Sequence, residues 1–189
     1  MIKFVGHWLF VCLLVLSNQA FSKQIAGIKV PETKTVAQTQ LTLNGAGIRS
    51  KFFMDLYVGS LYLKAPETIA DKVITLDETM MVQLDITSGM ITSDRMIEAI
   101  EKGFEHATNG NKQPINSEIE QFISIFSEPI KIKDNFQLLY QPQRGLTVLK
   151  NNKVINEQAI SPTFKRALFA IWLGDKPAQK SLKKAMLGQ

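Results

Sequence analysis

The stretch from Leu41 to Lys64, LTLNGAGIRSKFFMDLYVGSLYLK, decides more about the fold than any other part of this 189-residue chain. Gly45 and Gly47 predict a tight turn, because glycine adopts backbone angles that other residues avoid. Arg49 follows as a permanent positive charge, and Phe52 to Leu63 has the pattern of a long apolar strand. Two structures fit this pattern equally well: an ordinary hairpin, or a cation at the mouth of an apolar sheet.

The predicted strand carries two tyrosines, Tyr57 and Tyr62, which alternation places on opposite faces. Both faces are largely apolar, so we expect a central strand that is covered on both sides. One face suits a pocket, because Gly59 would leave space beside Tyr57. Arg49, Tyr57 and Tyr62 are therefore the candidate ligand-binding residues, and a packed two-sided core is the other interpretation.

The remaining elements are predicted from hydrophobic periodicity, caps and breakers. Strands are expected at Ile25–Val30, Thr35–Leu43, Lys72–Leu76, Met81–Ile86, Phe136–Gln141, Leu146–Leu149 and Lys153–Ile155. Helices are expected from Thr92 or Ser93 to Gly110, from a Ser117–Glu120 capping box, from Ser161-Pro162 to Leu173, and over Ala178–Leu187. Turns are expected at Pro142–Gly145 and Asn151–Asn152. This order predicts an α+β fold, an open-faced sandwich with helices on one face of a large antiparallel sheet.

The first residues have the pattern of a secretory signal, Met1 to Ser22. Their apolar run from Trp8 to Leu16 is shorter than a membrane-spanning helix, which needs about 20 residues. We therefore expect cleavage near Ser22, a single domain over residues 23–189, and a periplasmic or secreted protein. An uncleaved N-terminal anchor is the alternative.

Few residues of the chain suit nucleophilic or metal chemistry. The only cysteine, Cys12, and one of the two histidines, His7, lie in the predicted signal. His106 lies near the end of a predicted helix, where a histidine most often interacts with the helix dipole. The sequence therefore predicts no metal site and no cofactor.

The whole sequence has 22 basic and 17 acidic residues, and many of the lysines fall in its second half. Such an excess can attract anionic lipid, so we consider peripheral membrane contact. The lysines near the C-terminus also suit an ordinary solvated helix face. No run interleaves basic and aromatic residues as a single-stranded nucleic-acid site requires, and we expect no nucleic-acid partner.

Two segments resemble the chalcone isomerase-like family. Residues 44–63, NGAGIRSKFFMDLYVGSLYL, are similar to its Gly-Ala-Gly-x-Arg segment and the aromatic strand that follows. Residues 169–188, FAIWLGDKPAQKSLKKAMLG, are similar to its C-terminal segment. The resemblance implies an open-faced sandwich, and a family that includes flavonoid-cyclising isomerases, fatty-acid-binding relatives and bacterial secreted proteins.

Of the cleft residues that the resemblance implies, only the arginine is kept, as Arg49. The strand threonine falls at Tyr57, the helix tyrosine near Ser93, the asparagine near Ile100, and the late hydroxyl near Ile171. Isoleucine cannot donate a hydrogen bond, so the catalytic set is incomplete.

The leading hypothesis is therefore a secreted, non-catalytic protein that binds a small amphipathic anion, such as a fatty acid, beside Arg49. One alternative is an intramolecular lyase of the chalcone isomerase type, in which Arg49 stabilises enolate charge. The other is a periplasmic interaction protein with a filled core, in which Arg49 caps the turn or pairs with Asp55. The sequence names no protein partner.

Overall fold

The computed structural model describes residues 22–36 and 38–189. The predicted signal, Met1 to Ser22, lies outside these residues apart from Ser22. Within the described residues, no helix combines the length and the apolarity needed to cross a membrane. Nor do three acidic, histidine or cysteine side chains of this part gather closely enough to hold a metal ion.

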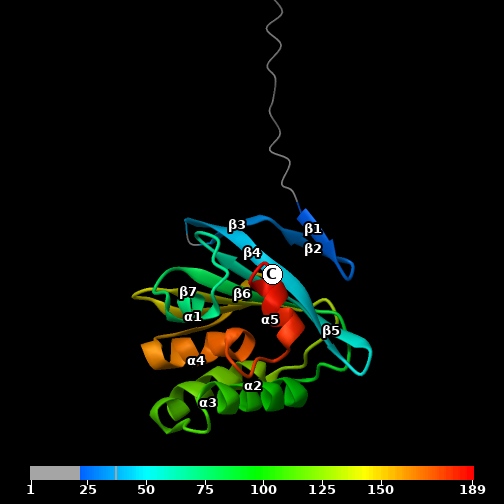
Figure 1. Ribbon diagram of the computed structural model, residues 1–189. Helices are drawn as coiled ribbons and strands as arrows, with labels where there is room; N and C mark the ends of the chain where they lie inside the picture. The colour runs from blue at the N-terminus through cyan, green and yellow to red at the C-terminus, as the bar shows by residue number, and fades with distance from the viewer. Residues whose placement is uncertain (1–21, 37) are drawn as a thin grey trace, which may run out of the picture.

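A curled antiparallel sheet forms one layer and helices form the other, as the sequence predicts (Figure 1). The strands follow their order in the sequence: β3 (Thr33–Val36), β4 (Thr39–Lys51), β5 (Met54–Leu63), β6 (Met80–Ile86), β7 (Asn135–Gln141), β8 (Gly145–Lys150) and β9 (Lys153–Gln158). A separate hairpin of β1 (Ser22–Ile25) and β2 (Ile28–Pro31) precedes them.

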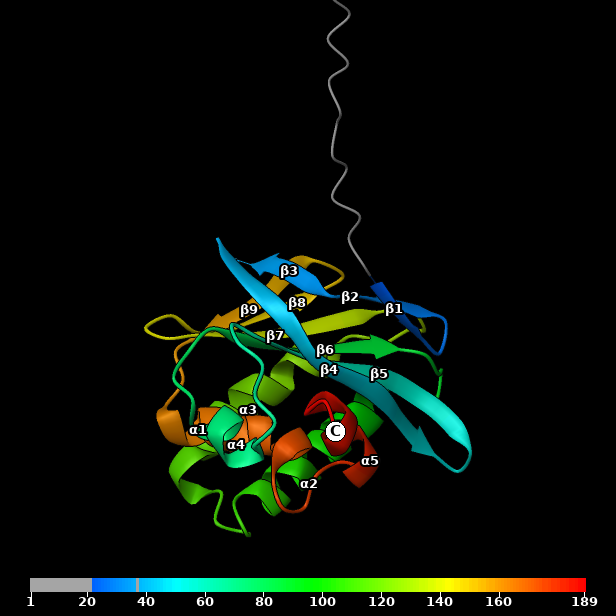
Figure 2. The ribbon, with the colours of Figure 1, turned by 45° about the horizontal axis from the view of Figure 1, so that its top comes forward.

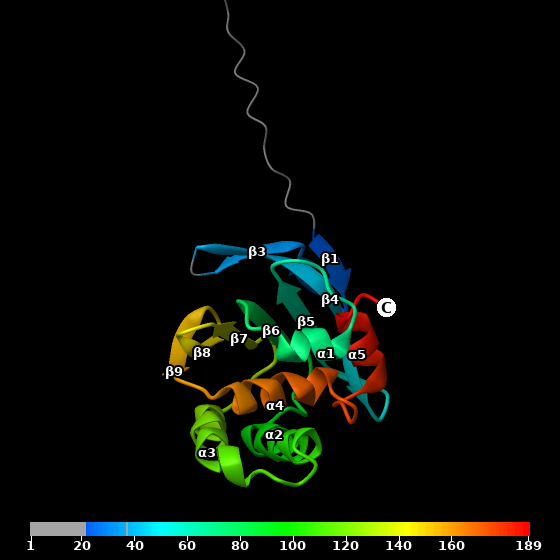
Figure 3. The same cartoon turned by 60° about the vertical axis from the view of Figure 1, so that its left-hand side comes forward.

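The helices lie on one side of the sheet, with α4 nearer to it than α2 and α3 (Figure 3). They are α1 (Ala70–Thr75), α2 (Ser93–Ala107), α3 (Asn116–Ser124), α4 (Pro162–Leu173) and α5 (Lys180–Met186), with short 3-10 turns η1 (Gln113–Ile115) and η2 (Ile125–Ser127). The main core fills the space between the layers and includes a cluster of phenylalanines with ring centroids 5.2 to 6.2 Å apart: Phe104, Phe122, Phe126, Phe136 and Phe164.

The opposite face of the sheet has a smaller core of its own. Val30 from the β1–β2 hairpin packs there with Val58, Tyr62 and Met81. Strand β5 therefore lies inside the sheet with apolar cover on both sides, as predicted from its composition. The hairpin itself corrects the expected single strand at Ile25–Val30, because the chain reverses between β1 and β2.

Several local signals act as the sequence indicates. Thr92 caps α2 by accepting a hydrogen bond from the Arg95 backbone amide, and Ser161 caps α4 by accepting one from the Phe164 amide. The β8–β9 turn at Asn151 and Asn152 has both residues at positive φ, 53° and 64°, where asparagine is favoured.

Two local predictions are wrong because tertiary contacts decide those segments. Lys72–Leu76, a strand in the sequence prediction, lies in and just after α1. There the Lys165 ammonium binds the carbonyls that have no partner within the helix. Ser117 does not cap α3, because that helix already begins at Asn116. Glu120, the other residue of the predicted box, instead accepts from the Asn116 side-chain amide at 2.7 Å.

The predicted glycine turn is also wrong. Gly45 and Gly47 lie within β4, both with ordinary φ, and the chain reverses later, at Phe52 and Phe53. Lys51 pairs with Met54, so these two phenylalanines form a two-residue hairpin loop. Their φ values are 50° and 63°, a left-handed conformation that costs about 1–2 kcal/mol for a residue with a Cβ.

Replacing the loop with the residues that its backbone favours should therefore stabilise the protein. We expect the double substitution Phe52→Asn and Phe53→Gly to raise the free energy of unfolding by about 1–2 kcal/mol. Urea titration followed by circular dichroism measures this value. A lower free energy of unfolding would show that the phenylalanine side chains make stabilising contacts that outweigh the strain.

Lys165 on α4 is 3% exposed, and its ammonium donates to the carbonyls of Val73, Ile74 and Leu76 at 3.3, 2.8 and 2.6 Å. These carbonyls belong to the C-terminal end of α1, which has no further helical partners for them. Burial lowers the pKa of Lys165 to about 8. The side chain ties α1 to α4, at the cost of disfavouring its own charged form.

This shift predicts a pH dependence of stability. Between about pH 8 and the ordinary lysine pKa of 10.5, the unfolded chain binds more protons than the folded one, so the free energy of unfolding should rise with pH. We expect the stability difference between wild type and Lys165→Met to grow in favour of wild type from pH 7.5 to pH 10. Tyrosines also titrate in this pH range, but they are common to wild type and Lys165→Met, so their contribution cancels in the difference. A stability difference that does not change with pH would contradict the lowered pKa of Lys165.

Candidate functional site

Arg49 lies near the end of β4, opposite Tyr57 of β5, and is half-buried. Its Nη1 donates to the side-chain oxygen of Gln179 at 3.0 Å and to the Ser50 carbonyl at 3.5 Å. The Ser50 backbone amide donates to the same Gln179 oxygen at 2.9 Å. One amide oxygen, supplied by the residue that precedes α5, thus accepts from two donors on β4.

Tyr57 lies on the helix-facing side of the sheet and is 8% exposed. The indole Nε1 of Trp172 on α4 donates to its hydroxyl oxygen at 3.1 Å. Burial raises the pKa of Tyr57, while the Trp172 hydrogen bond and the Arg49 charge act in the opposite direction. The net shift is upward, so the phenol keeps its proton at neutral pH and is itself a donor.

Two donors therefore lie together, the Arg49 guanidinium and the Tyr57 hydroxyl, and the Trp172 indole holds that hydroxyl by donating to its oxygen. Within residues 22–36 and 38–189, the ion pairs are Lys72–Glu67, Lys112–Glu105 and Lys150–Asp134. Arg49 is in none of them, and Asp55 instead accepts from the Ser50 hydroxyl at 2.9 Å. A half-buried cation whose partners are all neutral is poorly compensated, and such a set of donors suits a carboxylate.

Tyr62, the third candidate residue, points to the opposite face of the sheet. Its hydroxyl donates to the Pro31 carbonyl at 3.0 Å, and its ring packs in the smaller core with Val58. The structure thus brings Arg49 and Tyr57 together and places Tyr62 under the β1–β2 hairpin.

The family resemblance implied further cleft residues at positions 93, 100 and 171. None of these three residues offers a free polar group beside Arg49 and Tyr57. Ile100 and Ile171 are each 5% exposed and belong to the main core. Ile171 packs directly on Gly103, where an added Cβ would come within 2.9 Å of it. The Ser93 hydroxyl donates to the Phe126 carbonyl. Ile100 on α2 and Ile171 on α4 thus make hydrophobic core contacts at the two positions where the family resemblance implied an asparagine and a hydroxyl.

Helix α5 determines where Gln179 lies, and the two glycines of β4 determine where α5 lies. A Cβ on Gly45 would come within 2.0 Å of the Ala185 carbonyl oxygen, and one on Gly47 within 2.6 Å of the Ala185 Cβ. A Cβ on Gly59 of β5 would likewise come within 3.2 Å of the Leu182 Cδ1. Because these glycines have no side chains, they form a flat surface against which α5 packs, called the glycine seat below.

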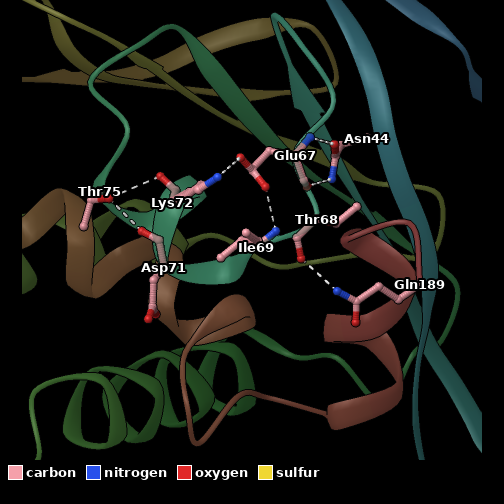
Figure 4. Close-up of polar contacts among 8 residues, drawn as sticks. All are labelled: Asn44, Glu67, Thr68, Ile69, Asp71, Lys72, Thr75 and Gln189. Carbon is pink, nitrogen blue, oxygen red and sulfur yellow. Dashed lines mark hydrogen bonds and ion pairs between the residues drawn. The ribbon is translucent and has the colours of Figure 1, made fainter.

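The far end of α5 is held by side-chain amides (Figure 4). Asn44 donates to the carbonyls of Glu67 and Met186, both at 2.9 Å, and accepts from the Glu67 amide at 2.8 Å. Gln189 donates to the Thr68 carbonyl at 2.8 Å. The segment before α1, the strand β4 and the chain end are thereby joined at one point.

Two hollows stand out in the described part of the chain, and neither reaches Arg49. The larger, of about 340 Å³, lies between η2 and the β8–β9 hairpin and is lined by residues that include Phe126, Lys150 and Asn156. The smaller, of about 140 Å³, lies beside the β7–β8 turn. In this conformation the Gln179 oxygen accepts from the Arg49 Nη1, so a ligand there would replace the Gln179 oxygen.

The candidates from the sequence include Arg49 and Tyr57 but neither Gln179 nor Trp172. Trp172 packs in the main core, yet its one polar atom faces Tyr57. Gln179 lies 130 positions from Arg49 along the chain. No local pattern indicates such a contact.

Comparison with known proteins shows the family of this chain. A chalcone isomerase-like family model matches residues 22–188, and the chain belongs to that family. Among curated proteins, none matches. The crystal structure of a fatty-acid binding protein from Arabidopsis thaliana superposes with a TM-score of 0.70 at 16% sequence identity, over 88% of this chain and 96% of that one. The similarity confirms the predicted fold.

The glycine seat gives a stability prediction. Gly45→Ala should lower the free energy of unfolding by about 2–3 kcal/mol, because its Cβ would overlap a backbone carbonyl that cannot move without displacing α5. Amide hydrogen exchange should rise over Lys180–Met186. Gly89→Ala is the matched control, since the nearest atom to its added Cβ is 3.8 Å away. Equal stability of the two variants would contradict the close packing of α5.

Proposed function

We propose that this protein is a secreted, non-catalytic binder of a small amphipathic anion, such as a fatty acid, whose carboxylate pairs with Arg49. The observation that carries the proposal is the half-buried Arg49 guanidinium without an ionic partner among the described residues, next to the Tyr57 hydroxyl, whose oxygen accepts from Trp172. Secretion is proposed from the signal-like segment that ends at Ser22.

The chemistry of a bound carboxylate fits this donor set. The Gln179 oxygen already accepts from the Arg49 Nη1 and the Ser50 amide, as one oxygen of a carboxylate would. A carboxylate replaces this neutral contact with a charge-assisted one, and it offers a second oxygen to the guanidinium. An apolar tail along the helix-facing side of β5 would have to displace Leu182 of α5, which occupies the space over Gly59.

The name of the Arabidopsis structure adds support, because that protein has the same fold and is described as fatty-acid binding. Isomerase activity is the less supported alternative. It requires donors that stabilise an enolate together with partners that orient the substrate. Isoleucines occupy positions 100 and 171, where the family resemblance implies such partners.

The direct test is a binding titration with a fluorescent fatty-acid analogue. Arg49→Met should weaken binding roughly tenfold to a hundredfold, the range for loss of a hydrogen bond to a charged group. Arg144→Met is the matched control, since Arg144 is an exposed arginine on the β7–β8 turn, at the other end of the sheet. It should leave the affinity unchanged.

A second variant tests the role of Gln179. Gln179→Glu places a carboxylate of the chain itself against Arg49 and should reduce the affinity for the fatty acid. The methyl ester of the same fatty acid should bind wild type weakly and should not distinguish wild type from Arg49→Met. Equal affinity of wild type and Arg49→Met for the free acid would refute the proposed site.

A further inference from the structure

Strands β4 and β5 extend past the rest of the sheet as a two-stranded arm, residues 50–56 (Figures 1 and 2). Strand β6 pairs with β5 only from Tyr57 onwards, where Tyr57 lies opposite Ile86. Beyond that row, Ser50 pairs with Asp55 and Lys51 with Met54. The Phe52–Phe53 loop therefore forms the tip of a projecting hairpin.

The tip exposes large apolar side chains. Phe52 is 75% exposed, Phe53 is fully exposed, and Met54 is 44% exposed. The backbone does not favour these residues, because Phe52 and Phe53 both have positive φ. The β8–β9 turn has the same pair of positive φ values and carries Asn151 and Asn152. Two phenylalanines at such positions serve neither the turn nor the core.

Three other loops lie at the same end of the sheet, because β6 and β8 end there and β7 and β9 begin there. They are residues 87–92, 128–134 and 151–153. The Thr87 hydroxyl donates to the Asp55 carbonyl at 2.9 Å, which joins the first of these loops to the arm. Ile132, 55% exposed, lies beside Gly89, so the second loop adjoins the first.

Lysines surround the exposed apolar residues at this end. Lys51 precedes the two phenylalanines, and its ammonium lies 5.3 Å from the centroid of the Phe52 ring. Lys131 and Lys133 flank Ile132, and Lys153 follows the Asn151–Asn152 turn; all four lysines are exposed. The acidic residues of the arm and the three loops are Asp55, Glu128 and Asp134. Asp55 accepts from the Ser50 hydroxyl, and Asp134 is paired with Lys150 at 3.3 Å.

We propose that this end of the sheet docks on an anionic lipid bilayer, with Phe52 and Phe53 inserted at the interface. Exposed aromatic and aliphatic side chains bordered by lysines match the two parts of a bilayer surface, its acyl boundary and its negative headgroups. A protein partner fits less well, because lysine is depleted in the cores of protein interfaces. The bilayer also needs no shaped pocket to accept a narrow hairpin tip.

Membrane docking goes beyond the proposed ligand function and does not depend on it. The two nevertheless fit together, because Arg49 lies three residues before Phe52, at the base of the arm. A tip in the headgroup layer would place the Arg49 donors close to the source of an amphipathic anion.

The test is co-sedimentation of residues 22–189 with vesicles of phosphatidylcholine alone or with about 30% phosphatidylglycerol, where the anionic lipid should raise binding through the lysines. Residues 22–189 contain every described strand and helix, and the full-length chain with the same substitutions is run in parallel. We expect binding to the anionic vesicles and at least a tenfold loss of binding in the Phe52→Asn, Phe53→Gly variant. This variant has the residues that the turn favours, and its urea titration shows whether it is folded under the conditions of the vesicle experiment.

Ile69→Asn is the matched control, since Ile69 is 48% exposed and lies after the opposite end of β5. It should bind vesicles as wild type does. Lys51→Gln with Lys131→Gln should reduce binding several-fold and weaken its dependence on salt. Arg49→Met should keep vesicle binding while losing the fatty acid, so failure of either proposal is seen separately. Equal binding by wild type and the Phe52→Asn, Phe53→Gly variant, or no binding by wild type, overturns the docking proposal.

Discussion

Helix α5 can lie against β4 and β5 only because Gly45, Gly47 and Gly59 carry no side chains where it packs. The helix in turn brings Gln179 to Arg49 at one end, while Met186 at the other end accepts from Asn44. The segment before α1 joins the same contact, because the Glu67 amide donates to Asn44 and the Thr68 carbonyl accepts from Gln189. The far end of the chain thus completes the surroundings of the arginine. A side chain at one of these glycines would displace α5, and would therefore move Gln179 away from Arg49 as well as destabilise the helix.

Two features of the β4–β5 hairpin are disfavoured by local physical chemistry. Arg49 is a half-buried cation with neutral partners, and Phe52 and Phe53 occupy left-handed positions with their side chains exposed. Neither kind of departure is confined to the hairpin, because Lys165 is a buried cation that binds three carbonyls and residues such as Gln38 and Gln143 also have positive φ. What distinguishes the hairpin is that Arg49 is half-buried rather than fully buried and that two large apolar side chains are exposed at its tip. Departures of this kind are expected where function imposes its own requirements.

Local signals predicted those parts of the fold whose partners are near in sequence. The Ser161 cap, the stop at Gly174 and the Asn151–Asn152 turn each depend on a few neighbouring residues. The glycine segment was misread because glycine has two uses, positive φ and absence of a side chain. Only the position of Ala185, about 140 residues later, shows that the second applies. Likewise, Ile25–Val30 was expected as one strand, whereas the chain reverses within it at positive φ.

The sequence by itself determined the α+β class, the central apolar strand and the presence of one arginine beside it, because composition and periodicity carry that information. It also placed Tyr57 and Tyr62 on opposite faces of that strand, with both as candidates beside Arg49. The tertiary structure decided that Tyr57 is the one beside Arg49, that the Trp172 indole donates to its hydroxyl, that the Gln179 oxygen accepts from Arg49, and where the hairpin tip projects. The Trp172 and Gln179 contacts join residues more than a hundred positions apart. Their energies come from packing and desolvation, which no local pattern records.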